Sequence, residues 1–221
     1  MTAEVWAIAR FTLLMALTAT LLVLPPAILV GWVLARRQFA GKALFETIVS
    51  LPLVLPPVAS GLVLLWLFGQ NGPLGRVLNT LGIEVVFTWK AVVIAMMVIS
   101  FPLVARSARA GIEQVDRRFE GVAATLGASW MRILTTVTLP LASRGIIAGA
   151  ILGFSRALGE FGATIMVAGA IPGRTRTLAV GIYTLVEAGR EEAAWGLVAI
   201  AVFLALTAVF ISNRIVDSAR P

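Results

Sequence analysis

Long apolar runs, separated by short polar segments, dominate this chain. Five of them, at about residues 11–35, 44–68, 90–105, 145–168 and 195–213, predict membrane-spanning helices, since about 20 helical residues cross a hydrocarbon layer. The runs are continuous and lack the alternation that membrane β-strands show. We therefore predict an all-α, polytopic helical membrane protein with five transmembrane helices in a single transmembrane domain, residues 1–221.

One polar and basic segment, residues 106–144, separates the third run from the fourth. In it, Asp116 is suited to cap a helix that stops at Gly127 in the left-handed conformation. Ser129 is suited to cap a second helix, which Pro140 ends. Such a hairpin could bind DNA, rest on anionic lipid or dock a soluble protein. Because both ends are tied to membrane spans, we favour docking to a protein.

Prolines interrupt the second run, at Pro52, Pro56 and Pro57. Proline removes a helix hydrogen bond, which membrane proteins tolerate where protein or water satisfies the backbone. The pattern predicts either a packing kink or a break that lines a pore.

Glycines recur every four residues in the fourth run, at Gly145, Gly149 and Gly153. Small residues at this spacing form a groove in which another helix can approach closely. That helix belongs either to this chain or to a second copy of it.

Composition agrees with a membrane protein and narrows the chemistry. The chain is 59% hydrophobic and 13% charged, against about 25% charged in soluble domains. It has no cysteine and no histidine, which excludes disulfides, thiolate or imidazole metal ligands and histidine-based catalysis. We expect no metal site and no catalytic residue.

The chain has a net charge of +7, and its basic residues are distributed unevenly between the two sides of the predicted spans. One side of the spans holds Arg36, Arg37, Lys42, Arg106, Arg109, Arg117, Arg118, Arg132, Arg144, Arg214 and Arg220; the other holds Arg10, Arg76, Lys90, Arg174, Arg176 and Arg190. The positive-inside rule then places the N-terminus outside and the C-terminus in the cytoplasm. It also explains the positive charge without a nucleic-acid partner. The first apolar run is too long for a cleavable signal peptide.

Two opposite charges, Arg156 and Glu160, lie inside the fourth run and are four residues apart, so they are predicted to share a helix face. They form either a neutralising structural pair or, with Ser155 and Thr164, part of the path of an anion. Serine and threonine hydroxyls can donate hydrogen bonds to such an anion without trapping it. The basic outer loop 173–177 either meets a partner or is a solvated turn.

ATP chemistry is not predicted for this chain. It has no Gly-x-x-x-x-Gly-Lys-Ser/Thr loop to hold phosphates, and its only lysines are Lys42 and Lys90. We expect no cofactor on this chain and no enzyme activity of its own.

Residues 120–127, EGVAATLG, followed by Leu139 and Pro140, resemble the EAA loop of permease subunits of bacterial ABC importers. The family pattern has alanine where this chain has Gly121. Four further stretches resemble molybdate permease subunits: LPLVLPP at 51–57, SFPL at 100–103, RALGEFGAT at 156–164 and IPGRTRTL at 171–178. The resemblance covers nearly the whole chain.

This resemblance implies an inner-membrane permease that works with a second copy of itself, a cytoplasmic ABC ATPase dimer that uses ATP and Mg²⁺, and an extracytoplasmic oxyanion-binding protein. The residues that it assigns to coupling with the ATPase are Glu120, Gly121, Ala123, Ala124, Gly127, Leu139 and Pro140. The candidate translocation path comprises Pro56, Pro57, Ser155, Arg156, Glu160 and Thr164.

The implied cargo is molybdate or a similar tetrahedral oxyanion such as tungstate. A sulfate or thiosulfate permease is the alternative within the same class. A proton-coupled secondary transporter would want buried titratable groups, and only Glu160 qualifies. A membrane scaffold without transport would leave the polar segment and the prolines of the second run without a purpose.

Overall fold

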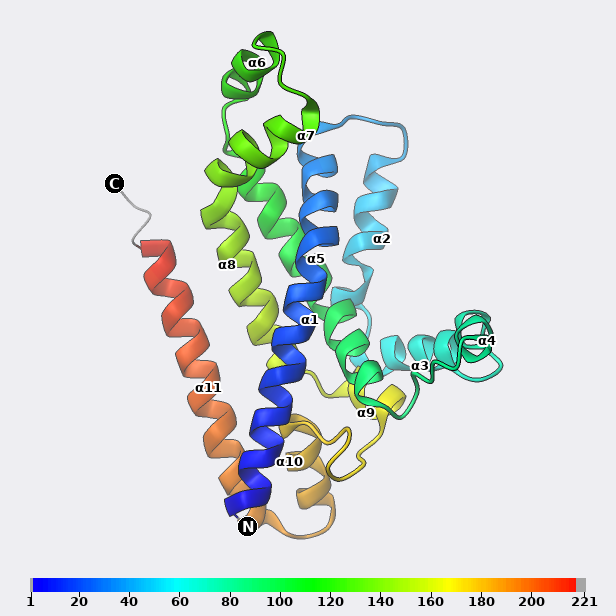
Figure 1. Cartoon of the computed structure of the whole chain (residues 1–221). Helices are drawn as coiled ribbons and strands as arrows, with labels where there is room; N and C mark the ends of the chain where they lie inside the picture. Colours follow the sequence, from blue (N-terminus) through cyan, green and yellow to red (C-terminus); the bar gives the residue numbers. More distant parts are fainter. Residues whose placement is uncertain (1, 218–221) are drawn as a thin grey trace.

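The computed structural model describes residues 2–217, and every regular element in that range is helical (Figure 1). The helices are α1 (Thr2–Arg36), α2 (Lys42–Val54), α3 (Pro57–Phe68), α4 (Pro73–Thr80), α5 (Trp89–Glu113), α6 (Arg117–Thr125), α7 (Trp130–Ile133), the π-helical turn η1 (Leu134–Thr138), α8 (Leu139–Leu158), α9 (Gly162–Ala168), α10 (Leu178–Glu187) and α11 (Glu191–Asp217).

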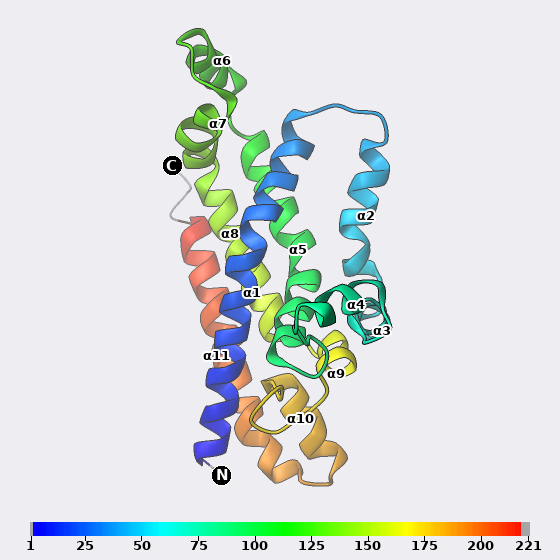
Figure 2. The same cartoon turned by 45° about the vertical axis from the view of Figure 1, so that its right-hand side comes forward.

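Among the described residues, four stretches are long and apolar enough to cross a membrane: Glu4–Arg36, Trp89–Glu113, Trp130–Leu158 and Glu191–Ile211. The bent pair α2 and α3 makes a fifth if it is counted as one span. The all-α membrane fold is thus confirmed, and helices α1, α5 and α11 extend beyond the predicted spans 11–35, 90–105 and 195–213 at both ends. The first residues of α1 lie at one end of the long axis, and α11 starts near that end and runs toward the other (Figure 2).

The second predicted span, 44–68, is broken at its prolines, which was one of the two alternatives that the sequence left open. The helix axis bends by 110° between its two halves, α2 and α3. Leu55 is extended, with φ −65° and ψ 140°, because a residue that precedes proline is pushed out of the helical region. Pro57 then opens α3 at a position where its missing N–H is not needed. The prolines therefore break the helix rather than kink it.

The fourth predicted span, 145–168, is wrong at both of its ends. At its start, α7, η1 and α8 form one continuous stretch, Trp130–Leu158. Pro140 therefore does not end the second hairpin helix. It stands in the first turn of α8, where proline costs little. At the other end the chain leaves the helix at Gly159, and α9 forms a separate short helix.

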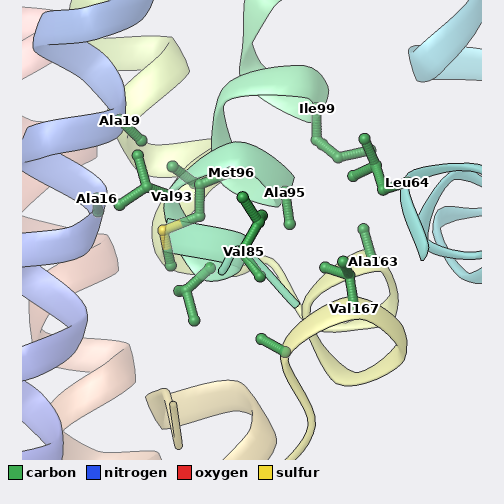
Figure 3. Packing of buried hydrophobic residues seen from close by; sticks show 14 residues of the cluster. Ala16, Ala19, Leu64, Val85, Val93, Ala95, Met96, Ile99, Ala163 and Val167 are labelled. Atoms are coloured by element: carbon green, nitrogen blue, oxygen red, sulfur yellow. The ribbon is translucent and has the colours of Figure 1, made fainter. Parts of the chain in front are cut away.

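Helix α5 lies between α1 and α8 and has its most extensive contacts with these two. On one side of α5, Met96 and Val93 lie toward Ala16 and Ala19 of α1 (Figure 3). On another side, Ile99 of α5 lies near Leu64 of α3. Most α5 side chains in its apolar half are buried, whereas α11 presents a row of exposed apolar side chains. In lipid, such exposed apolar faces are compatible with a spanning helix.

The glycine groove of α8 receives α5 of the same chain, which settles one alternative that the sequence left open. A Cβ atom on Gly145 would lie 2.7 Å from the Cα of Gly111, and one on Gly149 would lie 2.6 Å from the Cβ of Ser107. Real side chains essentially never approach so closely. The two backbones are therefore as near as glycine allows.

A second glycine contact joins α3 to α9, two short helices that are distant in sequence. A Cβ atom on Gly162 would lie 2.7 Å from the Cβ of Pro57, and one on Gly61 would lie 2.8 Å from the Cα of Ala163. These contacts hold the segment that follows α8 against the corner made by α2 and α3 (Figure 2).

We predict that Gly145→Ala destabilises the fold by about 1–3 kcal/mol, the usual effect of overpacking, because the added methyl group meets the backbone of α5. Gly196→Ala in α11 is the matched control, since its nearest contact would be an ordinary 3.9 Å from Val5. Tryptophan fluorescence during thermal unfolding in detergent measures both. Equal melting temperatures for the two variants would contradict the prediction.

Candidate functional site

The hairpin formed by α6 and α7 projects from one end of the helices (Figure 1). Asp116 caps α6, since its carboxylate accepts from the backbone N–H of Arg118 at 2.9 Å. Gly127 has φ +80°, and the Ser129 hydroxyl accepts from the backbone N–H of Arg132 at 3.4 Å. The predicted helix, tight turn and second helix start are all confirmed.

The outer surface of this hairpin is apolar, although it stands beyond the membrane-spanning stretches. Its large exposed side chains include Phe119, Val122, Leu126 and Met131. Gly121, Ala124 and Trp130 are also exposed, but they line a cavity on the side of the hairpin that faces α1. Exposed apolar patches of this kind mark sites of interaction. None of these large side chains is among the predicted site residues, although Phe119, Val122 and Leu126 follow helical spacing.

The other residues assigned to coupling differ in exposure. Ala123 and Leu139 are half-buried, and Pro140 is exposed at the start of α8. A cavity of about 390 Å³ lies between the hairpin and the end of α1. Its lining includes Glu120, Gly121 and Ala124 on one side and Trp32 and Arg36 on the other.

Glu120 faces this interior and not the apolar patch. Its Oε1 accepts hydrogen bonds from the Nε of Arg36 at 3.1 Å and from the hydroxyl of Thr138 at 2.8 Å. The side chains of Glu120 and Arg36 are 19% and 8% exposed. The residue that opens the EAA-like segment thus contacts its own chain.

The intramembrane charges Arg156 and Glu160 form an ion pair, but they do not share one helix face as predicted. Since α8 ends at Leu158, Glu160 lies in the turn that precedes α9. Its Oε2 is 2.9 Å from the Nη1 of Arg156, an ion pair without hydrogen-bond alignment. Its Oε1 accepts from the backbone N–H of Ala163 at 2.9 Å. Glu160 is 1% exposed and caps α9, whereas the side chain of Arg156 is 32% exposed.

The hydroxyl groups near this pair are not equivalent. Ser155 donates to the carbonyl oxygen of Ile151 at 2.8 Å, so its proton is used within α8. Thr164 is fully buried, and its hydroxyl has no hydrogen-bond partner among the described residues. Pro56 and Pro57 are exposed at the corner between α2 and α3. Within residues 2–217, no cluster of three acidic side chains forms a candidate metal site.

We predict that Gly127→Val loosens the hairpin, because a β-branched residue at φ +80° costs about 1–2 kcal/mol. No atom lies within 4 Å of the added Cβ, so the effect is conformational and not steric. Hydrogen–deuterium exchange over residues 116–130 should accelerate. Gly121→Ala, which is equally unobstructed but helical, should slow exchange; the same acceleration in both variants would refute the argument.

Comparison with protein families matches residues 27–220 to the binding-protein-dependent transport system inner membrane component family. Molybdenum transport system permease protein ModB of Haemophilus influenzae is 43% identical over 92% of this chain and 90% of its own length. The ModB of Escherichia coli K12 is 42% identical, covering 97% and 95%. Sulfate transport system permease protein CysT of Salmonella typhimurium is 34% identical, covering 96% and 76%.

Solved structures agree on the fold. The MetNI methionine ABC transporter in inward-facing conformations matches with a TM-score of 0.67 and 20% identity, over 100% of this chain and 96% of that chain. A bacterial alginate ABC transporter, in complex with its alginate-bound periplasmic protein, matches with a TM-score of 0.70 and 17% identity, over 97% and 77%. This chain belongs to the family of inner-membrane components of binding-protein-dependent transport systems.

Proposed function

We propose that this chain is the permease subunit of an ATP-driven importer that carries molybdate, or a similar tetrahedral oxyanion such as tungstate, across the inner membrane. The projecting hairpin with its exposed apolar patch is the observation that carries the proposal, because it gives a membrane protein a docking surface outside the lipid. The choice of cargo is supported by the molybdenum permeases at 42–43% identity. A sulfate permease is the second candidate, supported by 34% identity to CysT.

The energy for transport comes, in this proposal, from a separate cytoplasmic ATPase that uses ATP and Mg²⁺. The chain has no phosphate-binding loop of the P-loop type. A short helix such as α6 fits a groove on a partner through apolar side chains at helical spacing. The patch around Phe119, Val122 and Leu126 meets this requirement. Closure of the ATPase dimer would then displace the hairpin.

The topology follows from the charges. The end of the molecule that carries the hairpin also holds most of the basic residues, so it lies in the cytoplasm. The N-terminus is then outside and the C-terminus inside. In this proposal a second copy of this chain completes the pathway, as the resemblance to importer permeases implies, and the exposed faces of α2 and α3, with Val54, Val58, Leu62 and Trp66, are available to meet it. An extracytoplasmic binding protein delivers the oxyanion.

The path of the anion runs, in this proposal, past Arg156. Glu160 neutralises much of the charge of this guanidinium, so a dianion is attracted without being held, as conduction requires. The same pair disfavours a proton-coupled secondary transporter. Both oxygens of Glu160 are already engaged, one with Arg156 and the other with the N–H of Ala163, which is the arrangement of a structural contact.

Reconstitution into vesicles tests the proposed function. The chain, co-purified with its ATPase and supplied with loaded binding protein, should accumulate molybdate only with ATP inside the cytoplasmic compartment. Elemental analysis of the vesicles measures uptake, and sulfate in the same assay tests the second candidate. Uptake driven by a pH gradient without ATP would instead support a secondary transporter, and no ATPase partner on purification would refute the proposal.

We predict that Arg156→Ala impairs both assembly and uptake, because it leaves the buried carboxylate of Glu160 unpaired. The double variant Arg156→Ala, Glu160→Gln removes that buried charge and keeps an oxygen that can accept from Ala163. Co-purification with the ATPase should recover in the double variant, whereas uptake should stay about tenfold low, the scale of one charge-assisted hydrogen bond. Full recovery of uptake would show that the pair is purely structural.

A further inference from the structure

One carboxylate oxygen joins three elements that are far apart in the sequence. Glu120 Oε1, on α6, accepts from Arg36 at the end of α1 and from Thr138 at the end of η1. These partners lie 84 and 18 residues away along the chain. The carboxylate therefore ties the projecting helix to the root of two membrane-spanning stretches.

Arg36 also holds the chain that enters α6. Its Nη2 lies 2.9 Å from Glu120 Oε1 and donates to the carbonyl oxygen of Val115 at 2.9 Å. A single guanidinium thus contacts α6 and the residue that precedes its cap. Because a guanidinium is planar and rigid, contacts to two of its nitrogens fix orientation as well as distance.

This contact is shielded from water. The side chain of Arg36 is 8% exposed and Thr138 is 1% exposed. Charge-assisted hydrogen bonds in such surroundings are stronger than those of exposed pairs, which contribute little. Beside this contact, the ring centroids of Trp32 of α1 and Trp130 of α7 lie 5.7 Å apart. The two rings add an apolar contact between α1 and the hairpin.

The π-helical turn η1 places the third partner. The backbone N–H of Leu139 donates to the carbonyl oxygen of Leu134, a spacing of five residues. Such turns insert one extra residue into a helix and occur often at functional sites. Here Thr138, the last residue of the turn, faces α6.

We infer that Arg36 is the positioning residue that transmits displacement of α6 to α1 and to the stretch that becomes α8. This inference rests on the proposed function. The apolar patch on the outer side of α6 receives the ATPase, while Glu120 on the inner side connects α6 to the membrane domain through Arg36. Arg36 acts without touching the ATPase, because its side chain is buried beneath the hairpin.

Single substitutions in the reconstituted importer test this role of Arg36. In Arg36→Gln, ATPase co-purification and ATP hydrolysis should be retained, whereas molybdate carried per ATP hydrolysed should fall about tenfold, as expected when charge-assisted hydrogen bonds are lost. Arg37→Gln is the matched control. Arg37 is the next residue, and its guanidinium lies over the ring of Trp32 at 5.6 Å; the ratio should stay near that of the unchanged chain.

A double-mutant comparison separates transmission from an independent role of Glu120 at the ATPase. If Glu120 acts through Arg36, Glu120→Gln should lower the ratio as Arg36→Gln does, and the two together should lower it no further. An additive loss would overturn the inference. So would an Arg36→Gln importer that couples normally.

If the Arg36→Gln importer does not assemble, a variant with the two charges exchanged still tests the inference. Arg36→Glu combined with Glu120→Arg restores opposite charges across the same contact. Recovery of both assembly and coupling, relative to either single exchange, supports the inference, and no recovery overturns it. If the unchanged importer hydrolyses ATP but carries no oxyanion, the proposed function fails instead, which keeps the two outcomes distinct.

Discussion

Apolar side chains gain little by leaving lipid for a neighbouring helix, so helices in a membrane are held by close packing and by polar contacts. In this chain the closest packing is between α5 and α8, where Gly145 meets Gly111 and Gly149 meets Ser107. Because α8 is continuous with α7 through η1, this contact also places the root of the hairpin. Helix α5 packs on α1 from its other side, so the position of Arg36 depends on the same contact.

The hairpin has two faces with different chemistry. Its outer face carries exposed apolar side chains, which suit a partner that binds and releases. Its inner face carries Glu120, enclosed by Arg36 and Thr138, which suits a permanent contact. In the EAA-like segment Glu120, Gly121 and Ala124 all line the cavity between the hairpin and the end of α1, whereas Val122 lies on the exposed apolar face. A resemblance in sequence names such a segment but does not say which side each residue faces.

Much of this architecture was predictable from local signals. Asp116, Ser129 and Gly127 carry short-range rules of capping and left-handed conformation, and all three hold in the structure. The predicted helix bounds are wrong where contacts between distant segments override the local preference of a residue. Pro140 predicts a helix end, yet it stands in the first turn of α8, which follows the π-helical turn η1 without a break. The break at Gly159 was hidden within an apolar run, because hydropathy does not distinguish one helix from two. The pairing of Arg36 with Glu120 joins residues 84 apart, and no periodicity connects them.

The interlocked glycines of α3 and α9 have a mechanical consequence. Gly162 lies against Pro57 and Gly61 against Ala163, so neither short helix can roll or slide past the other without a clash of main chains. The two must travel as one rigid body. Leu55 and the turn at Gly159 connect this body to α2 and α8, and Gly69 and Gly169 connect it to α4 and to the segment before α10. Any rearrangement of the membrane domain that leaves this body intact places its torsional change in these four connections.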